Sequence, residues 1–144
     1  MEIRHKVFAY ITHGRRLLVF DHVHYPEAGT QVPAGTRPPD EEPEAAVLRE
    51  AFEETGLANL RLVRFLGEVD MPFPEHNIIH RRRFYHLVCE DERPPERWQH
   101  PELYSSEGNG PIWFEHYWVD LPDGVPPLSG RHDAFLAELI AINS

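Results

Sequence analysis

Three carboxylates crowd into the segment REAFEETG, residues 49–56, as Glu50, Glu53 and Glu54. If this segment is helical, Glu50 lies one turn before the other two, and all three project within an arc of about 100°. Like charges at this spacing destabilise a helix by roughly 0.2–0.5 kcal/mol per pair, and anions near its C-terminal end also oppose the dipole. Charged oxygen ligands are what a hard divalent cation such as Mg²⁺ binds. The cluster therefore suggests a metal site, and a solvated acidic surface is the simpler alternative.

The element that must position these carboxylates is a helix, predicted from about Pro43 to Thr55. Proline is tolerated in the first turn of a helix, and Gly56 stands where a C-terminal cap belongs. On a helical wheel, the carboxylates lie opposite a side that we expect to face the core. That side consists of Ala45, Leu48, Phe52 and Thr55. Arg49 is the only cation on the helix, which is little counterweight for an ordinary surface.

The segments around this helix have the pattern of strands. Apolar or alternating runs predict strands at residues 6–13, 17–20, 60–69, 78–90 and 112–119, with a short extended piece at 31–35. A closing helix is expected at about 130–141, with Ser129 as its N-cap. The polar, proline-rich stretch 91–111 predicts a long loop, and 71–76 a turn. This order favours an α/β protein with a mixed β-sheet covered by helices.

Composition narrows the class of protein. A chain of 144 residues with 41% hydrophobic content suits a single domain, residues 1–144. The net charge of -10 argues against broad nucleic-acid binding, which needs a positive surface. No apolar run is long enough for a membrane helix, no secretory signal begins the chain, and Cys89 is the only cysteine. We therefore expect a cytoplasmic protein without disulfides.

The carboxylates belong to a longer pattern of spaced residues that begins upstream of them, at Gly35. Its spaced residues are Gly35, Glu41, Arg49, Glu50, Glu53, Glu54, Gly56 and Leu57. This pattern resembles the Nudix box, the signature of the Nudix hydrolase family: Gly-x5-Glu-x7-Arg-Glu-aliphatic-x-Glu-Glu-x-Gly-aliphatic. All of its fixed positions match. The one departure is Ala51, where the family has a larger aliphatic residue; this is a packing position, so we expect the chemistry to be intact.

The resemblance implies an α/β/α sandwich with a mixed β-sheet. It also implies hydrolysis of a phosphoanhydride bond in a nucleoside diphosphate linked to another moiety, a small-molecule nucleotide derivative, with Mg²⁺ or Mn²⁺ as cofactor. The implied metal ligands are Glu50, Glu53, Glu54 and the carbonyl oxygen of Ala34. Arg49 and Glu41 would orient the carboxylates by ionic hydrogen bonds. Gly35 would form a tight loop, and Gly56 would end the helix with a positive φ.

A carboxylate must accept the proton of the attacking water. Glu50 or Glu53 is the expected base, but family members also recruit one from outside the box. Here the outside candidates are Glu107, in the sequence SSEGNG, and Glu115. Glu107 is also a candidate metal ligand.

Substrate contacts are expected outside the box. Arg81 and Arg83 could hold a phosphate or another anionic group, and Phe73 could stack on a base. Because residues in a strand alternate faces, at most two of Arg81, Arg82 and Arg83 can point into one site. The substrate itself (ADP-ribose or a nucleotide sugar, a dinucleoside polyphosphate, or a (d)NTP) is left open, as are the number of metal ions and a homodimeric state.

Two other functions fit the same residues. The chain could be a non-catalytic, nucleotide-sensing module of Nudix-like fold, although a pure sensor has no need for three mutually repelling ligands. It could also be an interaction protein whose acidic face only keeps it dissolved. In that case Mg²⁺ would not raise its melting temperature, whereas a ligand of the folded state must do so.

Overall fold

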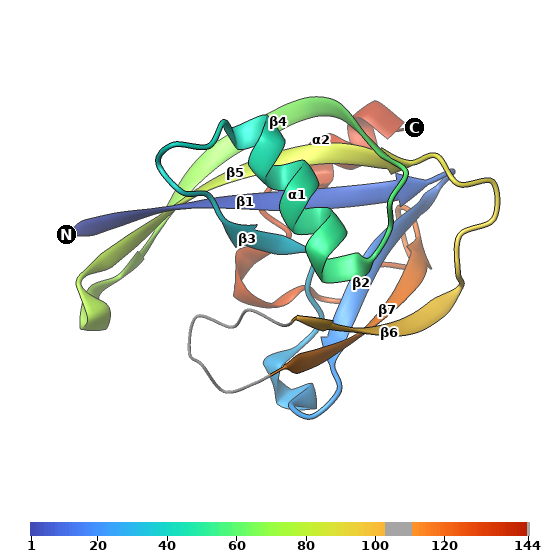
Figure 1. Ribbon diagram of the computed structural model, residues 1–144, viewed down its shortest axis with the longest axis horizontal. Coiled ribbons are helices and arrows are strands. Elements are labelled where there is room, and N and C mark those ends of the chain that lie inside the picture. Colours follow the sequence, from blue (N-terminus) through green and yellow to red (C-terminus); the bar gives the residue numbers. More distant parts are fainter. Residues whose placement is uncertain (103–110, 144) are drawn as a thin grey trace.

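The computed structural model describes residues 1–102 and 111–143, and in these ranges seven strands form one mixed sheet (Figure 1). The strands are β1 (Glu2–His13), β2 (Arg16–His22), β3 (Ala34–Thr36), β4 (Leu60–Phe73), β5 (Ile78–Cys89), β6 (Arg97–Glu102) and β7 (Ile112–Asp120). Their order is β4-β5-β1-β2-β7-β6, and β3 pairs with β1. The helices are α1 (Pro43–Thr55) and α2 (Leu136–Asn143), with short 3-10 turns at Pro26–Ala28, Pro74–His76 and Ser129–Arg131.

Strand β1 is central to the fold because its side chains contribute to the cores on both faces of the sheet. It runs parallel to β5 from Glu2 to Thr12 and antiparallel to β3 at residues 6–8. Its alternate side chains join two separate cores. Val7 packs with α1 in one core, and Phe8 packs with α2 in the other. Figure 1 shows α1 in front of the sheet and α2 behind it, which confirms the predicted α/β/α sandwich.

The bounds of α1 are those predicted, and its core-facing side is correct in part: Thr55 is buried and Leu48 packs against the core, as expected. Phe52 is 51% exposed and Ala45 is exposed, whereas Glu54 is only 5% exposed. The buried apolar residues of α1 are Ala46, Val47 and Ala51. The prediction was wrong for Ala45 and Phe52 because the true inner side contains a carboxylate as well as small residues. Gly56 ends α1 with a left-handed φ of 79°, and its N–H donates to the carbonyl of Phe52, as predicted.

Three further expectations are corrected, two by pairing between distant segments and one by backbone conformation. Residues 97–102, expected in a loop, form β6 because they pair with β7. Strand β4 continues through the predicted turn to Phe73 because it pairs with β5. Helix α2 begins at Leu136 and not at 130, since Gly130 and Arg131 have positive φ angles of 60° and 62°. Ser129 is therefore no N-cap; its hydroxyl donates to the carbonyl of Ala28 instead.

None of the helices in the described ranges has the length and apolar character needed to span a membrane.

Candidate active site

The predicted carboxylates meet at a cleft of about 840 Å³ beside α1. Helix α1 contributes Arg49, Glu50, Glu53 and Glu54 to its wall, and β3 contributes Ala34–Thr36. The helix and the strand come together because β3 pairs with β1, against which α1 packs. The fold thus brings the two halves of the sequence motif to one surface.

Gly35 allows this close approach. It lies within β3, paired with Val7, and does not form the tight loop that we expected. A Cβ atom on Gly35 would lie 2.1 Å from the carboxylate carbon of Glu50. The absence of a side chain therefore makes room for Glu50 against the strand, and this contact is the reason for a glycine here.

Glu54 is the most deeply buried carboxylate of the cleft. One of its oxygens accepts a long hydrogen bond of 3.5 Å from the backbone N–H of Ala34, and Oε1 has no partner among the described residues. Burial, followed by the charge of Glu102, raises the pKa of Glu54 well above its ordinary value. A buried carboxylate is costly unless a cation or hydrogen-bond donors compensate it.

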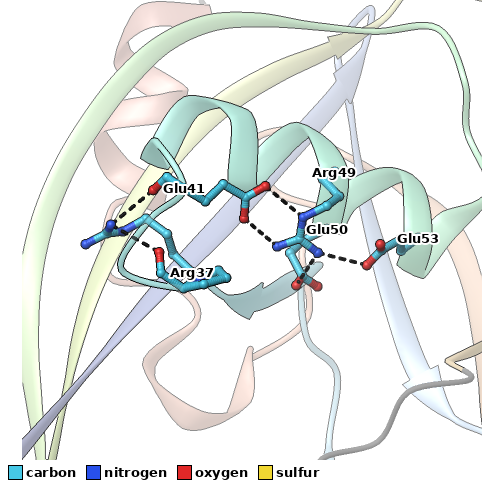
Figure 2. A network of polar contacts seen from close by, with 6 residues as sticks. Arg37, Glu41, Arg49, Glu50 and Glu53 are labelled. Atoms are coloured by element: carbon cyan, nitrogen blue, oxygen red, sulfur yellow. Dashed lines mark hydrogen bonds and ion pairs between the residues drawn. The ribbon is translucent and has the colours of Figure 1, made fainter.

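Arg49 is the hub of the polar network around the helix (Figure 2). Its guanidinium forms a two-point ion pair with Glu41, with N–O distances of 2.9 and 2.7 Å. Nη1 donates to Glu50 at 2.9 Å and to Glu53 at 3.0 Å. These hydrogen bonds lower the pKa of Glu41 and raise that of Arg49. The geometry agrees with an orienting function for Arg49 and Glu41.

The donor set suits a hard divalent cation, although it is not yet assembled around one. Among the described residues, no three His, Cys, Asp or Glu side chains are already arranged to hold an ion. Arg49 draws Glu50 and Glu53 toward itself, while Glu54 keeps an unpartnered oxygen in the cleft. Binding an ion would exchange the hydrogen bonds of Arg49 for oxygen–metal bonds. The residues suit a divalent ion because their donor atoms are carboxylate oxygens. One of these oxygens, Oε1 of Glu54, is buried without a hydrogen-bond partner among the described residues.

Glu102, at the end of β6, is a carboxylate of the cleft that sequence reasoning missed. Burial raises its pKa, and the charge of Glu50 adds to the effect. It escaped notice because residues 91–111 were expected to be a loop; the alternation in RWQHPE was the available signal. Glu107 lies outside the described residues. Glu115 lies away from the cleft lining and pairs with Arg97 and Gln99.

The strand of three arginines presents the middle one to the cleft. Arg82 lines it, whereas Arg81 forms a two-point ion pair with Asp70 and Arg83 pairs with Glu68 on β4. Phe73 contacts the ring of His80 and does not reach the cleft lining. The structure therefore does not bring Arg81, Arg83 and Phe73 to the carboxylates. The alternation of faces was correct, but the sequence could not say which face is inward.

An aromatic group also lines the cleft. Phe20 and Phe114 have ring centroids 4.5 Å apart, and His22 meets Phe114 edge-on at 4.7 Å. Flat apolar rings beside a charged site suit a ligand that has both a heterocycle and phosphates.

A model of the NUDIX domain matches residues 3–139. The chain belongs to the NUDIX family. Nudix enzymes act on small nucleotide derivatives and generally use divalent metal ions, and the expected activity class, a Nudix-type pyrophosphohydrolase, agrees with this membership.

Solved structures share the fold at low sequence identity. A MutT NUDIX hydrolase from Burkholderia pseudomallei is 22% identical, with 96% of this chain and 99% of that chain covered, at a TM-score of 0.66. The E. coli ORF135 protein is 18% identical, with coverages of 100% and 93% and a TM-score of 0.69. A UDP-X diphosphatase is 17% identical; the match covers 99% of this chain and 63% of the other, at a TM-score of 0.66. A search of curated proteins found no significant match.

Proposed function

We propose that this Nudix chain hydrolyses a phosphoanhydride bond of a nucleoside diphosphate derivative, using Mg²⁺ or Mn²⁺ held by Glu50, Glu53 and Glu54. The observation that carries the proposal is the buried Glu54, whose Oε1 has no partner among the described residues. An ionised carboxylate in this position is costly, and a divalent cation beside it would offset that cost. Glu102 and the carbonyl oxygen of Ala34 are further oxygen donors at the same place.

The chain's own residues supply orientation and proton transfer. A divalent ion held by these carboxylates would neutralise phosphate oxygens and lower the pKa of a water molecule. Glu50 or Glu53 would accept the proton of the attacking water, and Arg49 donates hydrogen bonds to both carboxylates. Glu41 fixes Arg49 through two hydrogen bonds, so it acts on the reaction through the position of the other three.

The test is a screen of nucleotide derivatives with Mg²⁺ and with EDTA, with products separated by chromatography. It includes ADP-ribose, nucleotide sugars, dinucleoside polyphosphates and (d)NTPs, since a UDP-X diphosphatase is among the proteins that share the fold. Hydrolysis that needs the metal and is lost in Glu53→Gln supports the proposal. Glu44→Gln is the matched control, because it removes the same charge from an exposed position of α1.

Two results would reject this function. Full turnover by Glu53→Gln would remove the assignment of the carboxylates. Nucleotide binding in calorimetry without product from any compound would indicate a sensing module instead.

A further inference from the structure

A cationic wall faces the carboxylates across the cleft. Lys6 on β1 and Arg82 on β5 are partners in the parallel register of these strands. Both line the cleft, together with His80 two residues earlier on β5. Neighbouring residues at matched positions of paired strands project to the same face of a sheet. The two positive side chains therefore lie beside each other, on strands that the core holds rigidly.

Arg82 is buried without an acidic partner. It is 6% exposed, and among the described residues it forms no ion pair. Nη1 donates to the carbonyl of Gly130 at 2.6 Å, the guanidinium lies 5.0 Å from the ring centroid of Phe8, and Nε has no hydrogen-bond partner. Arg81 and Arg83, on either side, each have a carboxylate from β4. A buried guanidinium with a donor to spare requires an anion that the described residues do not supply.

Lys6 has the same deficit. Its ammonium donates to the hydroxyl of Thr36 at 2.8 Å, and no described carboxylate forms an ion pair with it. Burial lowers the pKa of Lys6, and the charges of Glu50 and Glu102 act in the opposite direction. The ammonium is thus close enough to the carboxylates of the cleft to feel their charge.

His80 adds an uncharged donor to this wall. Burial, and then the charges of Lys6 and Arg82, lower its pKa to about 4, so the ring is neutral near pH 7. Its Nδ1 is buried and has no partner among the described residues.

We propose that Lys6 and Arg82, with His80 beside them, form an anion subsite that holds a phosphate group of the substrate across the cleft from the carboxylates. The proposal rests on the proposed function, because it assigns one part of the same substrate. It assigns two phosphates of that substrate to different parts of the cleft: one is bound by the carboxylate side and another by this subsite. Arginine suits the second position because its planar fork matches phosphate oxygens.

The test uses inorganic pyrophosphate, which is not a nucleotide and requires no turnover. Calorimetry with Mg²⁺ present compares the wild type with Arg82→Gln and Arg81→Gln. Arg81→Gln is the matched control, since it removes the same charge from the next residue of β5, which points away from the cleft. We expect pyrophosphate to bind Arg82→Gln about ten- to a hundredfold more weakly, the effect of one charged hydrogen bond, and Arg81→Gln as well as the wild type.

A second measurement exploits the single lysine of the sequence. An amine-reactive reagent can modify only Lys6 and the N-terminal amine, and peptide mass spectrometry separates the two. Pyrophosphate should protect Lys6 and leave the N-terminus reactive, and Arg82→Gln should weaken that protection. If Arg82→Gln does not fold, Lys6→Gln tests the same subsite by calorimetry, because Lys6 is only half-buried.

The outcomes separate this subsite from the hydrolase itself. Equal pyrophosphate affinity of the wild type, Arg82→Gln and Lys6→Gln, each verified as folded, overturns the subsite whatever the enzyme hydrolyses. Pyrophosphate binding that depends on Arg82, with no hydrolysis of any nucleotide, supports the subsite and rejects the proposed function alone. Affinity for Mn²⁺, measured by electron paramagnetic resonance, should be the same in Arg82→Gln and the wild type, which shows that the carboxylate side is intact.

Discussion

Replacing Glu54 by glutamine should make the metal-free protein more stable, although it removes an expected metal ligand. Glutamine has the same shape, keeps an oxygen to accept the hydrogen bond from Ala34, and brings no charge into the buried position. A buried polar group without a partner costs about 1–3 kcal/mol, and more if it is charged. The amide nitrogen of glutamine would take the place of the unpartnered Oε1, so the two proteins differ by the cost of the charge, or of taking up a proton at pH 8. We expect this difference to be about 1–3 kcal/mol.

The expected change is large enough for a thermal melt in EDTA. For a chain of this length, 1 kcal/mol shifts the melting temperature by about 3 °C, so Glu54→Gln should melt about 3–9 °C above the wild type. Mg²⁺ at a hundred times its dissociation constant should stabilise the wild type by about 2.7 kcal/mol, or about 8 °C. It should have little effect on the variant. Mg²⁺ should therefore reduce or reverse the difference in melting temperature between the wild type and Glu54→Gln.

Glu44→Gln is the control for this experiment. Glu44 is exposed in the first turn of α1, where a negative charge favours the helix. Its replacement should leave the melting temperature unchanged or slightly lower it, and the response to Mg²⁺ should remain. The reasoning is refuted if Glu54→Gln is no more stable than the wild type in EDTA, or if Mg²⁺ stabilises both equally.

Three further predictions concern other residues that line the cleft. Gly35→Ala places a Cβ atom 2.1 Å from the carboxylate carbon of Glu50, so the side chain of Glu50 must rotate away. We expect about tenfold weaker Mn²⁺ binding and a similar melting temperature. Unchanged Mn²⁺ affinity would contradict the contact. Glu102→Gln should weaken Mn²⁺ binding about tenfold, measured by electron paramagnetic resonance, and unaltered binding would exclude Glu102 as a donor. Burial, and then the charge of Arg82, lower the pKa of His132 to about 4. As the pH falls from 6.5 to 4, the unfolded chain therefore binds a proton that the folded protein does not, and stability is lost by up to about 3 kcal/mol. Urea unfolding across this range should show a shallower pH dependence in His132→Gln, and an unchanged slope would show that His132 does not contribute.

Local sequence was sufficient for the bounds of the helix and for the presence of its carboxylates on one segment. The bounds of α1 follow from Pro43 in its first turn and from Gly56, whose left-handed φ ends it. The spacing of Glu50, Glu53 and Glu54 on this helix suggested a metal site. These features could be predicted because they depend on residues within a few turns of one another.

The inward faces were decided only by tertiary structure. Phe52 is exposed and Glu54 is buried because α1 packs against β1 through its small residues, which leaves the cleft to accommodate the carboxylates. Likewise, Arg82 enters the cleft, and Arg81 and Arg83 do not, because the register of β5 against β1 places position 82 beside Lys6. The period of two residues in a strand, or of 3.6 in a helix, shows which residues share a side of the element. It does not show which side will pack against the rest of the protein.

Glu102 depended on contacts that are more distant still. It reaches the cleft because β6 pairs with β7, a strand that lies beyond residues 103–110. Strand pairing of this kind is non-local, so neither the composition nor the periodicity of residues 97–102 could specify it. The sequence by itself identified the carboxylates of α1 as candidates, and the packing of distant strands determined which carboxylates share the cleft.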